Sequence, residues 1–169
     1  MIPRGALLLS VLLASCGLQP VYSSGGRGPA AATLADIAVQ PIPERAGFLV
    51  RSALRERFGA TAETPRYRLE VELRDEILGY GLRGDNSIAR ERRSLRARYR
   101  LIEVGSGAVV LDDVASSDGG IDRVSSDYAV VAAETTALER LAVEIARQIT
   151  AKIALAAKDG TLSPSRPRP

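Results

Sequence analysis

The side chain with the most specific chemistry in this sequence is the thiol of Cys16, the single cysteine of the chain. Arg4 and an apolar run from Ala6 to Ala14 precede it. A positive charge, a short apolar run and small residues before a cleavage point are typical of a secretory signal peptide. The run is about half the roughly 20 residues that a membrane-spanning helix needs. We therefore expect residues 1–15 to be a signal peptide that is removed.

The residues around Cys16 also predict a modification. Leu13, Ala14, Ser15 and Cys16 resemble a lipobox, in which the cysteine sulfur receives a diacylglycerol and the new amino group receives a fatty acid such as palmitate. Several acyl chains anchor a protein firmly, because each buried CH₂ contributes about 0.8 kcal/mol. A free thiol or an intermolecular disulfide is the alternative. Gly17 stands where an aspartate would favour the inner membrane, so we expect an outer-membrane anchor with the domain on the periplasmic side.

The remaining composition excludes several kinds of site. The chain has no histidine and no second cysteine, which rules out histidine triads, thiol–histidine pairs and the usual zinc ligands. A net charge of +3 and 4% aromatic residues do not favour nucleic-acid binding. Four aspartates fit no calcium loop and are expected at a solvated strand end and turn: Asp112, Asp113, Asp118 and Asp122. The sequence thus predicts a protein that is not an enzyme, with no catalytic residues, metal or cofactor.

The first part of the mature chain predicts a tether and two short elements. Residues 16–32 are rich in Gly, Pro, Ser and Ala, so we expect a lipidated, flexible tether. Modest alternation from Leu34 to Val39 predicts a short strand. Val50, Leu54 and Phe58 recur at four-residue spacing and predict a helix over residues 46–59.

The second part predicts a three-stranded meander followed by a long helix. Strict alternation from Tyr67 predicts the first strand, and a glycine-rich loop over residues 79–86 leads to a second strand over 87–104. A third strand over 108–116 and a loop over 117–127 come next. An apolar stripe from Val131 to Ile153 predicts a helix over 128–157. The basic, proline-rich residues 158–169 are expected to be disordered.

These elements can hide their apolar faces only against each other. We therefore expect residues 33–157 to form an α+β two-layer sandwich, with two helices packed on a small, largely antiparallel sheet. The expected element order is β-α-β-β-β-α.

The most conspicuous charge pattern is an arginine face on the middle strand. Its core-facing positions are Leu95, Ala97, Tyr99 and Leu101, and its opposite positions are Arg90, Arg92, Arg96, Arg98 and Arg100. Guanidinium groups bind phosphates bidentately, so this face is one candidate for an anion-binding surface. The alternative is cross-strand pairing with carboxylates of the preceding strand, namely Glu70, Glu72 and Glu76. Both interpretations stay open on the sequence.

Several features together resemble the LptE family of lipopolysaccharide-assembly lipoproteins. These are the lipobox with Cys16-Gly17-Leu18, a β-α start, a meander with a glycine-rich hairpin loop, and a long C-terminal helix that follows from SSDYAVVAAETTALERLAVEIARQI, residues Ser125–Ile149. The resemblance implies an outer-membrane protein that assembles with the β-barrel LptD, lies inside it, and binds lipopolysaccharide during its insertion into the outer leaflet.

The resemblance also implies basic residues for lipopolysaccharide. Arg83 in the hairpin loop matches one basic position of the family, with Arg90 and Arg92 behind it. The other position, at the start of the C-terminal helix, reads Val130-Val131-Ala132-Ala133 here and carries no base, so Arg123 is its nearest substitute. An auxiliary lipoprotein of an ABC-type lipid transporter is the alternative function. An enzyme that works only through carboxylates is a weaker third, and nothing in the sequence points to a cleft for it.

Cys16→Ala should abolish both lipid attachment and lipoprotein-specific processing, because the thiol is the acceptor of the first lipid. Partial function should survive, since a tether contributes local concentration and no contacts of its own. Mass spectrometry of the mature N-terminus measures this. An unmodified Cys16, or cleavage at another bond, would show the lipobox assignment to be wrong.

Overall fold

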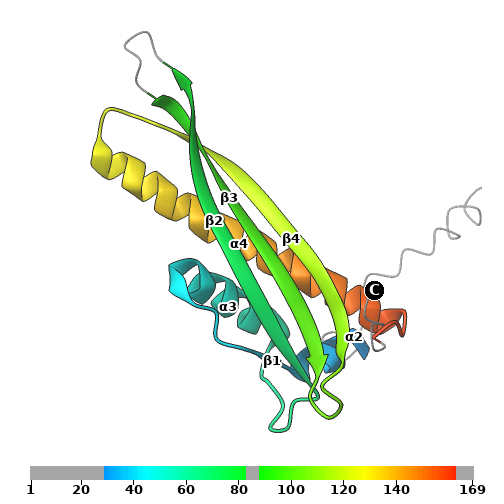
Figure 1. Cartoon of the computed structure of the whole chain (residues 1–169). Helices are drawn as coiled ribbons and strands as arrows, with labels where there is room; N and C mark the ends of the chain where they lie inside the picture. Colours follow the sequence, from blue (N-terminus) through cyan, green and yellow to red (C-terminus); the bar gives the residue numbers. More distant parts are fainter. Residues whose placement is uncertain (1–28, 83–87, 163–169) are drawn as a thin grey trace, which may run out of the picture.

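A layer of helices covers one face of a four-stranded sheet in the computed structural model, which describes residues 29–82 and 88–162 (Figure 1). The helices are α2 (Pro29–Ala35), α3 (Glu44–Phe58) and α4 (Asp127–Lys158). The strands are β1 (Ile37–Val39), β2 (Tyr67–Leu82), β3 (Ile88–Glu103) and β4 (Val109–Asp122). The predicted α+β class is confirmed. None of the helices in these ranges has the length and apolar character needed to span a bilayer.

The sheet has the order β1-β2-β3-β4 and is antiparallel except at its β1 edge. β1 runs parallel to β2, with Ile37 opposite Tyr67. β2, β3 and β4 form the predicted meander, and a register shift at Leu101/Ile102 lies near the start of β4. Side chains alternate between the two faces along each strand, and residues paired across neighbouring strands lie on the same face. Each face of the sheet is therefore formed by every second residue of each strand.

This alternation decides which side chains are buried. Tyr67, Leu69 and Val71 of β2 point to the helices, as predicted, and so do Leu95, Ala97, Tyr99 and Leu101 of β3. The alternation of β2 also predicts Leu73 and Ile77 on this face. Leu73 is partly buried against the core, but the prediction was wrong for Ile77, which is 41% exposed and has the charged Arg93 as its cross-strand neighbour. The α4 stripe opposite them consists of Leu138, Leu141, Ile145, Ile149 and Ile153, all at most 5% exposed. Burial this deep raises the pKa of the Tyr99 hydroxyl. The core is therefore the contact between one face of the sheet and one side of α4.

The predicted stripe was wrong at its first residue. Val131 is 59% exposed, and its neighbour Val130 is buried instead at 3%. α3 begins at Glu44 and lies beside the later turns of α4, so the first turns of α4 extend past it (Figure 1). Val131 lines the cleft that this arrangement leaves open.

The α3 helix was predicted correctly. Val50, Leu54 and Phe58 are buried against the core, and Gly59 ends the helix with a positive φ of 78°. Gly47 allows the first turn to pack on the preceding segment, because a Cβ there would lie 2.5 Å from the carbonyl oxygen of Ile42.

Several boundaries differ from the prediction. The short strand predicted from Leu34 begins only at Ile37, because Leu34 and Ala35 belong to helix α2. β2 continues through Gly79 and Gly81 to Leu82, and β4 continues through residues 117–122, which were expected to be loop. Cross-strand pairing with the long β3 outweighs the weak strand propensity of Gly, Ser and Asp. Helix α2 was not predicted, and its first residues, 29–32, were expected in the tether. It packs against α4 and buries Leu34.

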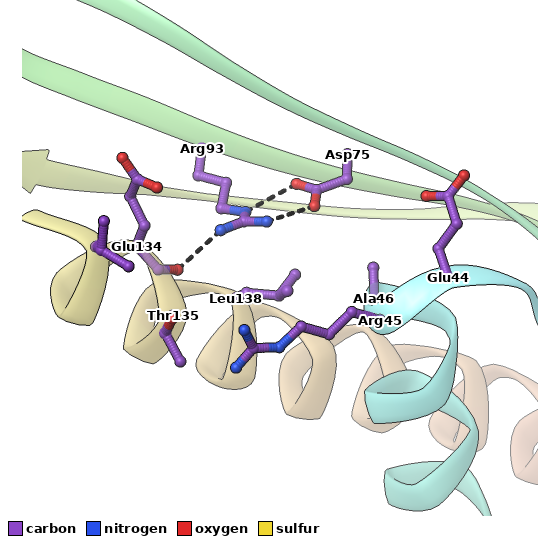
Figure 2. A pocket seen from close by; sticks show the side chains of 9 residues that line it. Glu44, Arg45, Ala46, Asp75, Arg93, Glu134, Thr135 and Leu138 are labelled. Carbon is purple, nitrogen blue, oxygen red and sulfur yellow. Dashed lines mark hydrogen bonds and ion pairs between the residues drawn. The ribbon is translucent and has the colours of Figure 1, made fainter.

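A partly buried ion pair joins α4 to the half of the sheet near the β2–β3 hairpin, which we call the distal half. The Arg93 guanidinium binds Asp75 through two bonds, Nε to Oδ1 at 2.9 Å and Nη2 to Oδ2 at 2.6 Å, and Nη1 donates to the Glu134 carbonyl at 2.9 Å (Figure 2). The hydrogen bond to Asp75 raises the pKa of Arg93. Both residues stand on the helix-facing side, where apolar residues would continue the core.

Leu141→Ala should lower the free energy of unfolding by about 2–5 kcal/mol, because it leaves a cavity between α4 and the sheet. Leu141 is 5% exposed, whereas Leu155 on the same helix is 50% exposed. Leu155→Ala is therefore the matched control and should change stability little. Urea denaturation of both variants measures this, and equal losses would contradict the assignment of the core.

Candidate functional site

The face of the sheet that carries no helices is polar and continuous. We call it the open face and define it by the residues of β2, β3 and β4 that alternate with the core positions. It comprises Arg68, Glu70, Glu72, Arg74, Glu76, Leu78 and Tyr80 of β2, Arg90, Arg92, Ser94, Arg96, Arg98 and Arg100 of β3, and Asp112, Val114, Ser116, Asp118, Gly120 and Asp122 of β4.

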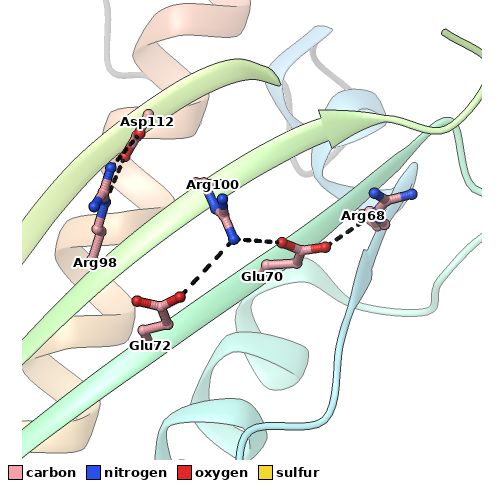
Figure 3. Close-up of polar contacts among 6 residues, drawn as sticks. All are labelled: Arg68, Glu70, Glu72, Arg98, Arg100 and Asp112. Carbon is pink, nitrogen blue, oxygen red and sulfur yellow. Dashed lines mark hydrogen bonds and ion pairs between the residues drawn. The ribbon is translucent and has the colours of Figure 1, made fainter. Parts of the chain in front are cut away.

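At the end of the open face farthest from the β2–β3 hairpin, which we call the proximal end, ion pairs cross the strands (Figure 3). Glu70 accepts from Arg68 Nε at 3.2 Å and from Arg100 Nη2 at 3.1 Å. Arg100 Nη2 also lies 4.0 Å from Glu72. Arg98 of β3 pairs with the neighbouring strand β4 on the same face, where it donates to both oxygens of Asp112. This hydrogen bonding holds the pKa of Asp112 below its ordinary value. The cross-strand pairing that the sequence offered as one interpretation is therefore present for Glu70 and Glu72, whereas Glu76 forms no ion pair within the described ranges, and β4 supplies the other carboxylates.

Toward the hairpin the acceptors come from β4 alone. Arg92 Nε lies 3.8 Å from Asp118, and Arg90 Nε lies 3.0 Å from Asp122. Asp112 lies in the predicted strand, beside Arg98. The expectation of a turn was wrong for Asp118 and Asp122, because β4 extends to Asp122 and places each of them beside an arginine of β3. A predicted strand that ends at residue 116 does not reach these two residues, so it could not place them opposite β3.

Asp113 was expected at the same solvated strand end as Asp112, and it lies on the other face of the sheet. Its carboxylate accepts from Lys152 of α4 at 2.9 Å, which lowers the pKa of Asp113. This pair connects β4 to α4 beside the buried stripe.

Of the arginines predicted for lipopolysaccharide, the structure describes Arg90, Arg92 and Arg123, and it places Arg123 on the opposite face of the sheet from the other two. Arg83 lies outside the described residues, as does the lipidation candidate Cys16. Arg90 and Arg92 are exposed on the open face near the hairpin. Arg123 lies on the helix-facing side, where its Nη1 donates to Glu91 at 2.7 Å.

Glu91 is a charged residue that the sequence prediction missed. Its side chain is 8% exposed, and its second oxygen has no hydrogen-bond partner among the described residues. A buried carboxylate is costly unless it is paired, so Arg123 stabilises it. The alternation of the strand could have revealed this, because Glu91 and Arg93 lie on the same face of β3 as Leu95 and Ala97.

The hairpin end of the open face also exposes apolar side chains. Leu78 is 62% exposed and Tyr80 is 43% exposed. The Arg92 guanidinium lies over the Tyr80 ring, 5.7 Å from its centroid. This end therefore combines cations and apolar surface, the pair of properties that an anionic lipid requires.

A cleft opens on the other face between α3, α4 and the Asp75–Arg93 pair (Figure 2). It has a volume of about 370 Å³ and is lined by charged residues of both signs together with Val131 and Leu138. Within residues 29–82 and 88–162 no group of three or more acidic or thiol side chains is arranged to hold a metal ion.

Known structures share this fold. A protein assigned as a lipoprotein from Caulobacter crescentus superimposes with a TM-score of 0.66 at 24% identity, covering 83% of this chain and 100% of the other. Lipoprotein B of Nitrosomonas europaea gives 0.57 at 14% identity, covering 75% of this chain and 84% of that one. Rare lipoprotein B of Shewanella oneidensis gives 0.54 at 13%, with 73% and 95% covered.

Similarity at the level of sequence comes from a family model. The chain matches no curated protein at a significant level. The model of the LptE family, described as lipopolysaccharide-assembly, matches residues 34–153, which extend from the end of α2 to the last turns of α4. This range covers most of the chain and nearly all of the fold described above. The chain therefore belongs to the LptE lipopolysaccharide-assembly family.

Proposed function

We propose that this protein is an outer-membrane lipoprotein, anchored through Cys16 on the periplasmic side, that assembles with an LptD-like β-barrel and binds lipopolysaccharide during its delivery to the outer leaflet. The observation that carries the proposal is the family match over residues 34–153, which includes the whole meander and the buried part of α4. The function is then that of a partner and not of an enzyme.

The open face supports a protein partner with a polar wall. Its charges are largely neutralised by each other, as in the pairs Arg98–Asp112 and Arg100–Glu70. A face of paired charges loses less on being covered than isolated charges would, since each ion keeps its counterion. The lumen of an outer-membrane barrel is polar, so such a face suits enclosure by it.

The hairpin end supports an anionic lipid as the second ligand. Arg90 and Arg92 are more than half exposed, and Leu78 and Tyr80 beside them offer apolar contact. Arg83 in the hairpin loop completes the set that we propose for lipid A or inner-core phosphates. Arg123 is left out of this set, because it lies on the helix-facing side and is bound to Glu91. Guanidinium–phosphate hydrogen bonds are charge-assisted and directional, which favours this ligand over a neutral lipid.

Purification of the tagged protein from its own cells in mild detergent should recover the barrel without chemical crosslinking. The expected complex has one copy of each chain, because the small domain is enclosed. A second tagged outer-membrane lipoprotein of unrelated fold is the control for nonspecific recovery. Recovery of an inner-membrane ABC permease in place of the barrel would instead support the transporter-lipoprotein alternative.

Arg83→Glu should weaken lipopolysaccharide binding by the isolated domain about tenfold or more, since it replaces a charge-assisted hydrogen bond with repulsion. Binding should also fall as salt is added. Arg55→Glu is the matched control, because Arg55 is exposed near the end of α3 and far from the hairpin. Equal losses in titrations of the two variants would mean that net charge alone determines binding.

A further inference from the structure

Two arginines interrupt the pairing of the open face. Arg74 of β2 stands directly opposite Arg96 of β3 in the antiparallel register, and both side chains are exposed. Within residues 29–82 and 88–162 neither guanidinium takes part in an ion pair or a side-chain hydrogen bond, whereas every other arginine of the open face has a carboxylate partner. Like charges directly opposite each other destabilise a strand pair.

The two arginines share a depression in the open face. One groove of about 450 Å³ is lined by Glu72, Leu73, Arg74, Arg96, Arg98 and Val114. A second groove of about 320 Å³ adjoins it, and both Arg74 and Arg96 line it together with the hydroxyl-bearing Ser94 and Ser116. An incoming anion at this point would meet two guanidinium groups and nearby hydroxyl donors.

We infer that the Arg74–Arg96 pair is the docking point for an acidic side chain on the wall of the barrel partner. The inference rests on the proposed function and names the part of the surface that the partner contacts. A carboxylate placed between two guanidinium groups accepts charge-assisted hydrogen bonds from both and removes their mutual repulsion. The isolated chain keeps this repulsion, and the complex relieves it.

The surroundings favour a protein carboxylate over a lipid phosphate. Glu72, Glu76 and Asp118 line the two grooves beside the arginine pair, so a densely charged phosphate group would meet repelling carboxylates on several sides. A single carboxylate of a partner surface with mixed charges can bind the two arginines, while basic side chains of the same partner surface pair with the acidic residues that flank them. The site also lies at mid-strand, away from the hairpin end proposed for lipopolysaccharide.

The test is the double substitution Arg74→Gln/Arg96→Gln in the full lipoprotein. Glutamine keeps much of the side-chain length and removes both charges. We expect the melting temperature of the purified full lipoprotein, measured without its partner, to stay equal or rise, because a like-charge contact is lost. We expect the affinity for the barrel to fall about tenfold or more, with a weaker dependence on salt. A gain in stability with a loss of partner binding is a combination that a merely structural role does not give.

The control is Arg55→Gln/Arg140→Gln, which removes two charges from exposed positions on the helical side and should leave barrel recovery unchanged. Wild-type barrel affinity in the Arg74→Gln/Arg96→Gln variant, or a lower melting temperature, would overturn the docking point and leave the proposed function intact. A variant that loses lipopolysaccharide binding and keeps the barrel would overturn the carboxylate assignment in favour of a phosphate site. Failure of the wild-type protein to recover any barrel would overturn the proposed function and this inference together.

Discussion

A long sheet can be covered on one face only if a helix runs almost its full length. The 16-residue strands β2 and β3 extend about 53 Å at 3.3 Å per residue, and the 32-residue α4 extends about 48 Å at 1.5 Å per residue. α3 has 15 residues and reaches only about 22 Å. Two helices therefore cover the proximal half of the sheet, and α4 alone covers the distal half. The contrast in chemistry between the two halves follows from this difference.

The proximal half buries a continuous apolar core between both helices and the sheet, with residues such as Leu69, Leu101 and Ile149 fully buried. In the distal half some of the same strand positions carry charged residues, and these residues form ion pairs. Arg93 and Asp75 tie the sheet to the Glu134 carbonyl of α4, and Glu91 is held by Arg123. In the distal half only α4 covers the sheet, and directional hydrogen bonds and ion pairs take the place of apolar packing there. Removing one member of such a pair would leave a partly buried charge without its partner.

The open face obeys a different requirement. Exposed ion pairs each contribute little to stability, so the ladder of arginines and carboxylates is not what keeps the sheet folded. Its pairs hold long side chains in fixed positions and leave most of the face close to neutral. That property suits a surface that is covered by another polar surface. The opposed Arg74 and Arg96 are the exception, and an isolated domain gains nothing from them.

The sequence by itself determined the class of fold, because alternation along β2 and β3 and the stripe of α4 each assign one buried face without reference to the rest of the chain. It also sufficed for α3 and for most core residues of β2 and β3, although Ile77, which shares their alternation, is exposed. Position within the sheet decided the remainder. Residues 117–122 are part of a strand because they pair with β3. Val131 is exposed because α3 does not extend far enough to cover it. The ion pairs depend on the strand register between segments that are distant in sequence. Only the tertiary structure therefore shows that Asp118 and Asp122 pair with arginines of β3 and that Arg74 lies opposite Arg96.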